Sequence, residues 1–97
     1  MSHQMTEEEA EKLSILLLQV VAKLDQSAAY VQDKDSKEEW DKYREAVGRA
    51  MGEICLELEE PLWKRFPKLK PKQLGGTYKI PPEIYEPRFY ERDDPAS

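Results

Sequence analysis

The sequence predicts an all-α fold: an antiparallel two-helix hairpin that dimerises into a four-helix bundle, with an extended C-terminal arm packed on it. All seven prolines lie at or after residue 61, so the first sixty residues can run as uninterrupted helix. Apolar residues in that half recur at alternating intervals of three and four, which is the spacing of a helical seam. The rest of the chain combines the prolines with many aromatic and branched side chains, which disordered tails usually lack.

The 97 residues suit a single small helical domain over 1–97. A hairpin of about 60 residues buries little surface by itself, because chains this short lie near the lower limit for independent folding. We expect a first helix over 6–32, a second helix over 36–60, a short helical turn over 61–66, an extended arm over 67–92 and a frayed terminus over 93–97.

The first helix is expected to begin with a capping box. Thr6 can accept a hydrogen bond from the Glu9 amide, while the Glu9 carboxylate accepts from the Thr6 amide. Residues 13–24 are apolar almost all round, and one partner helix cannot cover such a surface. We therefore expect self-association. The candidate packing residues on this helix are Leu13, Leu17, Val20 and Leu24.

The second helix is expected to begin at Ser36 and Glu39, which repeat the capping-box spacing, and to end or kink at Pro61. Its apolar stripe comprises Trp40, Tyr43, Val47, Ala50 or Met51, Ile54 and Leu58. Gly48 and Gly52 lie four apart in this helix, and each costs about 1 kcal/mol relative to alanine. This cost favours a close approach by another helix backbone; the alternative, that the glycines are merely tolerated, stays open.

The arm is expected to cover apolar surface rather than to hang free. Gly75-Gly76 indicates a turn within it. Its sequence does not show whether it lies on its own hairpin or on that of a second subunit. The candidate contact residues in the turn and arm are Trp63, Phe66, Tyr78, Tyr85 and Phe89.

Charge is divided between the two parts of the chain. Residues 1–60 carry seven basic and fifteen acidic side chains, whereas residues 61–97 carry eight basic and five acidic ones. We expect the basic segment to lie back along the acidic helices. The alternative is binding of single-stranded nucleic acid through residues 63–79, where rings alternate with cations, although the chain's pI of about 4.9 disfavours it. The candidate basic patch comprises Lys64, Arg65, Lys68, Lys70 and Lys72.

The sequence predicts no catalytic, cofactor or metal site. Cys55 is the only cysteine and His3 the only histidine, so neither a disulfide nor a Cys/His zinc cluster can form within the chain. We expect Cys55 to be a buried structural thiol. An active site built at a dimer interface is a further, less favoured alternative.

A cytoplasmic location and no membrane association are expected. Four glutamates precede the apolar run of the first helix, where a secretory signal needs positive charge, and the run is too short to cross a bilayer. The function that these features favour is a non-enzymatic protein–protein interaction module. It would act as a homodimer and serve as a small adaptor, a regulator or a subunit of an assembly, with a protein partner that the sequence does not name.

Overall fold

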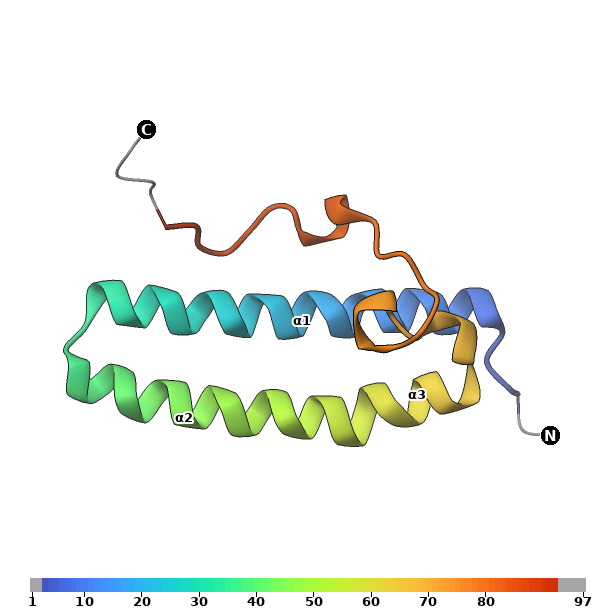
Figure 1. Cartoon of the computed structure of the whole chain (residues 1–97), viewed down its shortest axis with the longest axis horizontal. Coiled ribbons are helices and arrows are strands. Elements are labelled where there is room, and N and C mark those ends of the chain that lie inside the picture. Colours follow the sequence, from blue (N-terminus) through green and yellow to red (C-terminus); the bar gives the residue numbers. More distant parts are fainter. Residues whose placement is uncertain (1–2, 93–97) are drawn as a thin grey trace.

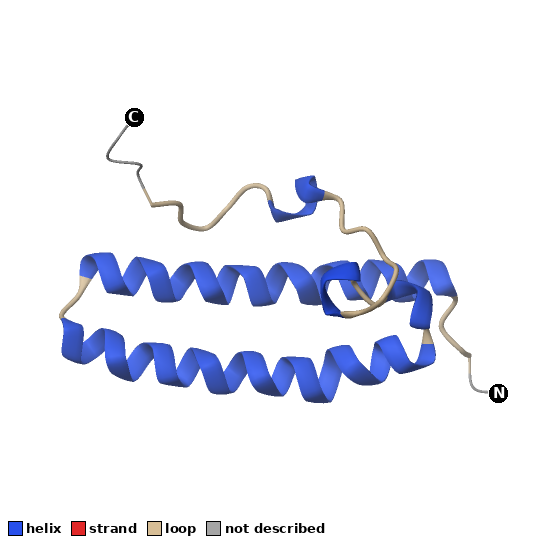
Figure 2. Ribbon diagram, viewed as in Figure 1, coloured by secondary structure: helices blue, strands red, loops and turns tan. Residues whose placement is uncertain are grey.

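The computed structural model describes residues 3–92, and within them it contains two long helices and no strand. The all-α prediction is therefore confirmed. The two long helices lie side by side in opposite directions, and the arm returns along the other side of α1 (Figures 1 and 2). The expected frayed terminus, 93–97, lies outside the described residues. The helices are α1 (Glu7–Lys34), α2 (Lys37–Glu53), a π-helical turn (Ile54–Glu59) and α3 (Glu60–Arg65), and the arm holds 3-10 turns at Pro67–Leu69, Lys72–Leu74 and Pro82–Tyr85.

The two long helices begin with different caps. At α1 the capping box is confirmed: the Glu9 amide donates to Thr6 Oγ1 at 3.1 Å, and the Thr6 amide donates to Glu9 Oε1 at 2.8 Å. At α2 the Ser36 hydroxyl accepts from the Glu39 amide at 3.2 Å. The Ser36 amide instead donates to Asp35 Oδ1 at 2.7 Å, so α2 has only half of the expected box.

The helical path continues through Pro61, although we expected the second helix to end or kink there. The π-helical turn before it makes this possible, with the Glu60 amide donating to the carbonyl of Cys55, five residues back. Proline has no amide to donate and its ring needs room beside the preceding turn, and the wider π-turn supplies that room. Pro61 then lies in the first turn of α3, where a missing amide costs least.

The extra residue of the π-turn changes which side chains face inward. Leu58, predicted to belong to the apolar stripe, is 51% exposed, and its neighbour Glu59 is only 5% exposed. The stripe assigned from the sequence is therefore wrong at this position, because the prediction assumed an unbroken α-helical period. A carboxyl group occupies the inward position instead.

The buried core lies at one end of the molecule, where the N-terminal half of α1 meets α3 and the start of the arm. Trp63 is at its centre, and its indole N–H donates to the buried Ser14 hydroxyl at 2.9 Å. Val47 is buried separately, on α2. The core residues are Ala10, Leu17, Leu62, Trp63 and Leu69, with Met5, Leu18, Ile54, Phe66 and Tyr78 packed against them.

Residues 70–79 form a closed loop, called the glycine loop below. Its ends are joined by the Lys72 amide, which donates to the Tyr78 carbonyl at 2.9 Å, and by the Tyr78 amide, which donates to the Lys70 carbonyl at 3.0 Å. Gly75 has a φ of 94°, which other residues rarely adopt. A Cβ atom on Gly76 would lie 2.0 Å from the Lys70 carbonyl oxygen. Both glycines are therefore required by the backbone of the loop.

Candidate functional site

A row of polar side chains on α1, called the polar row below, binds the turn and arm that follow the hairpin. Later residues of the arm bind later residues of α1, so the arm runs parallel to this helix (Figure 1). The polar row comprises Glu11, Gln19, Lys23, Gln26 and Asp33.

The middle of the polar row binds the arm through its backbone. Gln19 Nε2 donates to the carbonyl of Ile84 at 2.7 Å, and Lys23 Nζ donates to the carbonyl of Pro87 at 3.0 Å. Both side chains come from α1, and both arm groups lie in or after the 3-10 turn at Pro82–Tyr85. Contacts of this kind fix the path of an extended chain without selecting its side chains.

The far end of the row binds both backbone and side chains. Gln26 Oε1 accepts from the amides of Phe89 and Tyr90, at 2.6 and 3.3 Å. Asp33 Oδ2 accepts from the Arg92 guanidinium at 2.8 Å and from the Tyr90 hydroxyl at 2.6 Å. The hydrogen bonds from Arg92 and then from Tyr90 lower the pKa of Asp33, so its carboxylate stays charged and attractive to the arm.

The near end of the row binds Tyr78, whose hydroxyl donates to Glu11 Oε2 at 2.6 Å. Burial, together with the hydrogen bond and charge of Glu11, raises the pKa of Tyr78 to about 12. The phenol therefore keeps its proton at neutral pH and remains a donor.

Sequence reasoning missed the polar row. Residues 13–24 were treated as apolar almost all round, whereas Ser14 within them accepts from Trp63, and Gln19 and Lys23 bind the arm. A usable signal was present: Gln19, Lys23, Gln26 and Asp33 follow one another at intervals of four, three and seven, which places them on one face of a helix.

The five aromatic contact candidates fall into two groups. Trp63 is buried in the core, and Phe66 and Tyr78 pack against it. Tyr85 and Phe89 form the second group, on the later part of the arm. Tyr85 is half-buried, whereas Phe89 is 55% exposed. The Phe89 ring meets the Tyr30 ring edge-on, with 5.5 Å between the ring centroids.

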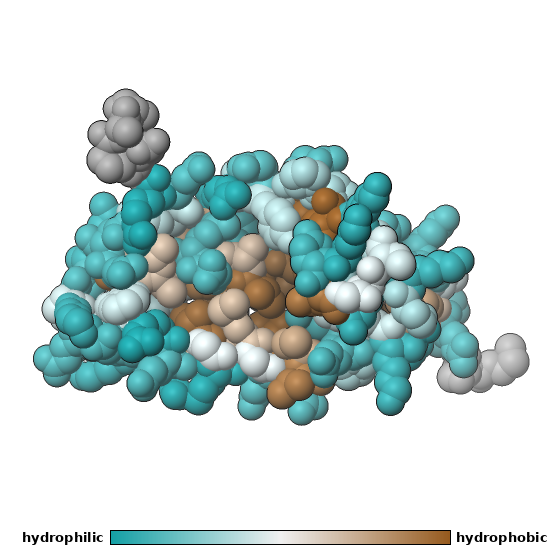
Figure 3. Space-filling view, viewed as in Figure 1, coloured by the Kyte–Doolittle hydropathy of each residue, from teal (hydrophilic) through white to brown (hydrophobic). Residues whose placement is uncertain are grey.

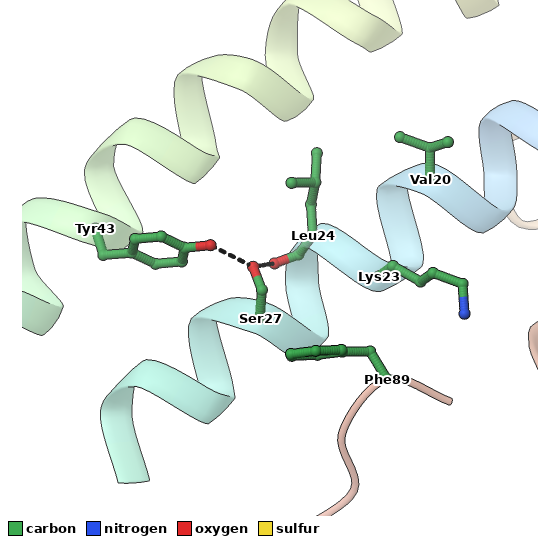
Figure 4. A pocket seen from close by; sticks show the side chains of 6 residues that line it. All are labelled: Val20, Lys23, Leu24, Ser27, Tyr43 and Phe89. Atoms are coloured by element: carbon green, nitrogen blue, oxygen red, sulfur yellow. Dashed lines mark hydrogen bonds between the residues drawn. The ribbon is translucent and has the colours of Figure 1, made fainter. Parts of the chain in front are cut away.

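An apolar recess of about 340 Å³ lies between the two long helices and the end of the arm (Figure 4). Its hydroxyl groups bond to each other or to the backbone: Tyr43 donates to Ser27 Oγ at 2.9 Å, and Ser27 donates to the carbonyl of Leu24 at 2.6 Å. The wall of the recess is therefore mainly hydrocarbon. Its lining residues are Val20, Lys23, Leu24, Ser27, Tyr43 and Phe89.

The helix-packing candidates differ in exposure within the single chain. Leu17 is buried, Leu24 is half-buried, and Leu13 and Val20 are each 37% exposed. Gly48 is exposed and Gly52 half-buried, and a Cβ atom added to either would meet nothing within 4 Å. Packing inside one chain therefore does not explain why these two positions are occupied by glycine.

The five residues of the basic patch are all exposed. Within residues 3–92, no acidic side chain lies within ion-pairing distance of any of them, so the described structure contains no salt bridge that would tie this segment to its own acidic helices. The Arg65 guanidinium lies over the Phe66 ring, 5.2 Å from its centroid.

The π-turn forms a second unusual site around Glu59. Burial raises the pKa of this carboxyl group, whose oxygens keep some contact with solvent in the described part of the chain. The charge of Glu59 in turn contributes to a raised pKa at two neighbours, Cys55 and Tyr85, for which burial is the larger cause. Cys55 is half-buried rather than buried as we expected. A thiol with a raised pKa is a poor nucleophile at neutral pH.

Glu59→Gln should therefore stabilise the protein at alkaline pH. The pKa of Glu59 is higher in the folded protein than in the unfolded chain, so its stabilising effect is complete below the unfolded value and is lost as pH rises through the folded one. The glutamine variant should gain on the order of 1 kcal/mol near pH 8, because it removes a negative charge from a largely desolvated position. Urea unfolding across pH measures this gain, with the exposed Glu57→Gln as the control. Equal effects of the two substitutions would contradict it.

Among residues 3–92, no group of three histidine, cysteine, aspartate or glutamate side chains could hold a metal ion. The described part of the chain also has no helix with the length and apolar character needed to span a membrane. Comparison of the sequence with protein families and with curated proteins, and of the fold with solved structures, found no match.

Proposed function

We propose that this protein is a cytoplasmic, non-enzymatic interaction module that acts as a homodimer. Two hairpins pair through their exposed apolar faces into a four-helix bundle, and the bundle serves as an adaptor, a regulator or a subunit of a larger assembly. The observation that carries this proposal is the amount of surface, including several large hydrophobic side chains, that a single chain leaves exposed.

The single chain is too open for a compact monomer of its size. It exposes 7430 Å², whereas a folded monomer of 11.4 kDa exposes roughly 5,800 Å². Its radius of gyration is 16.0 Å, compared with about 12.5 Å for a compact domain of this length. The excess surface is larger than the ~800 Å² that each partner contributes to a standard interface. A second copy would supply the missing burial.

Part of the exposed apolar surface lies where a second hairpin could cover it. Figure 3 shows apolar side chains and a hollow in the middle of one face, over the seam between the two long helices. The apolar recess opens between α1 and α2 and is lined by Val20 and Tyr43, both 37% exposed. On α2, the uncovered Gly48 and Gly52 would allow the backbone of a partner helix to approach closely.

Val20→Glu tests the dimer, because it places a carboxylate at the apolar recess while the buried core of the chain stays unchanged. A charge buried without a partner is strongly unfavourable, so the dissociation constant should rise about a hundredfold or more. Light scattering across protein concentration should show the wild type at twice 11.4 kDa and the variant near 11.4 kDa.

Leu74→Glu is the matched control, since Leu74 is equally apolar, 53% exposed and outside the hairpin. It should leave the mass unchanged. Gly52→Leu, which fills the proposed close contact, should act like Val20→Glu. A wild-type protein that remains a monomer at micromolar concentration would refute the dimer.

Binding of single-stranded nucleic acid through residues 63–79 remains the second candidate. The unpaired cations of the basic patch support it. The rings support it less, because Trp63 is buried and Phe66 and Tyr78 are half-buried against the core, which leaves little ring surface for base stacking. A salt-dependent mobility shift with single-stranded RNA or DNA would favour this function.

A further inference from the structure

The glycine loop is a rigid platform at the same end of the molecule as the core. Two backbone hydrogen bonds join its ends, Gly76 fits tightly against the Lys70 carbonyl, and the side chain of its own Pro71 is fully buried. A loop held in this way loses little conformational entropy when it binds a partner, which favours affinity.

The loop presents positive charge around a recess. Lys72, Gln73, Lys79 and Ile80 line a hollow of about 370 Å³, which contains two ammonium groups, one amide and one aliphatic side chain. No acidic residue is among these lining residues, and neither lysine has an ion-pair partner within residues 3–92. Leu74, on the same loop, is 53% exposed. The site therefore combines two unused cations with adjoining apolar contact.

The surroundings of the loop distinguish between classes of anionic partner. Among the nearby rings, Trp63 is buried and Phe66 and Tyr78 are half-buried against the core, which leaves little aromatic surface for nucleic-acid bases. An anionic membrane would have to approach Glu7 and Glu8, which share a hollow with Lys68 beside the loop. Leu74 is the only large apolar residue that residues 70–79 expose, which is little to insert into lipid. A protein segment can place carboxylates on the lysines and an apolar side chain on Ile80 or Leu74 without meeting those acids.

We propose that the glycine loop binds an acidic segment of a partner protein, with carboxylates paired to Lys72 and Lys79 and a neighbouring apolar side chain against Ile80. This inference rests on the proposed function, an interaction module, and names the chemistry of its partner. It does not require the dimer, because every residue of the site comes from one chain.

Fluorescence anisotropy tests the proposal with the full-length protein and a short labelled peptide rich in glutamate with interspersed leucines. The same peptide with glutamine in place of glutamate is the probe control. Lys72→Ala combined with Lys79→Ala should weaken binding of the acidic peptide about tenfold. The matched protein control is Lys37→Ala with Lys42→Ala, two exposed lysines that pair with acids on their own helix, and it should retain wild-type affinity.

Gly76→Val is the second variant, because it keeps both lysines but forces the loop away from the Lys70 carbonyl. It should lose affinity to a similar degree while circular dichroism shows the helices intact. The proposal is overturned if both double lysine variants lose the same affinity for the acidic peptide, or if the peptide shows no saturable binding at low salt. Tighter binding to single-stranded DNA or to phosphatidylserine vesicles than to the acidic peptide would also overturn it.

Light scattering on the same samples separates this inference from the proposed dimer. A dimer that does not bind the peptide overturns the loop site alone. A monomer that binds it through Lys72 and Lys79 overturns the dimer and supports the loop site.

Discussion

Trp63→Ala should lower the free energy of unfolding by about 3–5 kcal/mol, which is the usual cost of truncating a large buried aromatic residue. Trp63 belongs to α3, is 4% exposed and packs in the core with residues of α1 and the start of the arm. Its loss also removes the hydrogen bond to Ser14, a residue that is 1% exposed and would be left with a buried, unpaired hydroxyl. Because small domains have only about 5–15 kcal/mol of stability in total, the variant should be partly unfolded at moderate temperature. Urea unfolding followed by circular dichroism measures the change.

Trp40→Ala is the control for this experiment. Trp40 lies half-buried on α2, with the Arg44 guanidinium 5.0 Å from its ring centroid. Its replacement should cost about 1 kcal/mol, since it removes partial burial and one exposed cation–π contact. Similar costs for the two tryptophans would mean that the core is not centred on Trp63.

The main helical architecture could be predicted from local sequence signals. The absence of proline before residue 61 predicted helix over most of the first sixty residues, and the spacing of Thr6 and Glu9 predicted a cap that the structure contains. Signals of this kind need only neighbouring residues, so they can be read without knowing what packs on the helix. The predicted pairing of two hairpins depends on a second chain and stays a prediction.

The inward face near Pro61 could not be predicted in the same way. A π-turn inserts a residue without leaving any composition signal, and it replaces Leu58 with Glu59 on the inward face. Whether the chain ends its helix, kinks it or widens one turn before Pro61 depends on the packing of α3 into the core. That packing involves Trp63 and Ser14, which are forty-nine residues apart.

Among the candidate sites, the basic patch could be predicted from the sequence, but the aromatic contacts and the polar row could not, because they depend on contacts between distant residues. The basic patch was visible because charge and exposure follow directly from residue type. The aromatic residues of the same segment could not be assigned to a surface or to the core, since that depends on whether Tyr78 meets Glu11 and whether Trp63 meets Ser14. The polar row was missed because each of its members was judged alone, and its role exists only when the arm lies beside α1.

Two truncations should distinguish the part of the arm that stabilises the fold from the part that contributes little to stability. Removing everything after Phe66 should destabilise the protein severely, because it deletes Leu69, which is 4% exposed in the core, and the fully buried Pro71. Loss of one buried leucine side chain alone costs about 2–5 kcal/mol. The Tyr78–Glu11 contact is lost as well. Thermal unfolding should show a large drop in melting temperature, accompanied by lower solubility as the core surface becomes exposed.

Removing everything after Ile80 should instead cost only about 1 kcal/mol. The deleted residues bind the polar row mainly through exposed or half-exposed hydrogen bonds, each worth about 0.5–1.5 kcal/mol, and releasing them restores conformational entropy that offsets most of this gain. If the shorter truncation unfolds the protein as severely as the longer one, the polar row contributes far more than its exposed contacts suggest. If neither truncation changes the melting temperature, the residues after Phe66 are a tail, and the core must be complete without Leu69. A severe loss at Phe66 with a small one at Ile80 would mean that the folded unit ends with the glycine loop, and that the remaining arm is free to leave α1 without unfolding it.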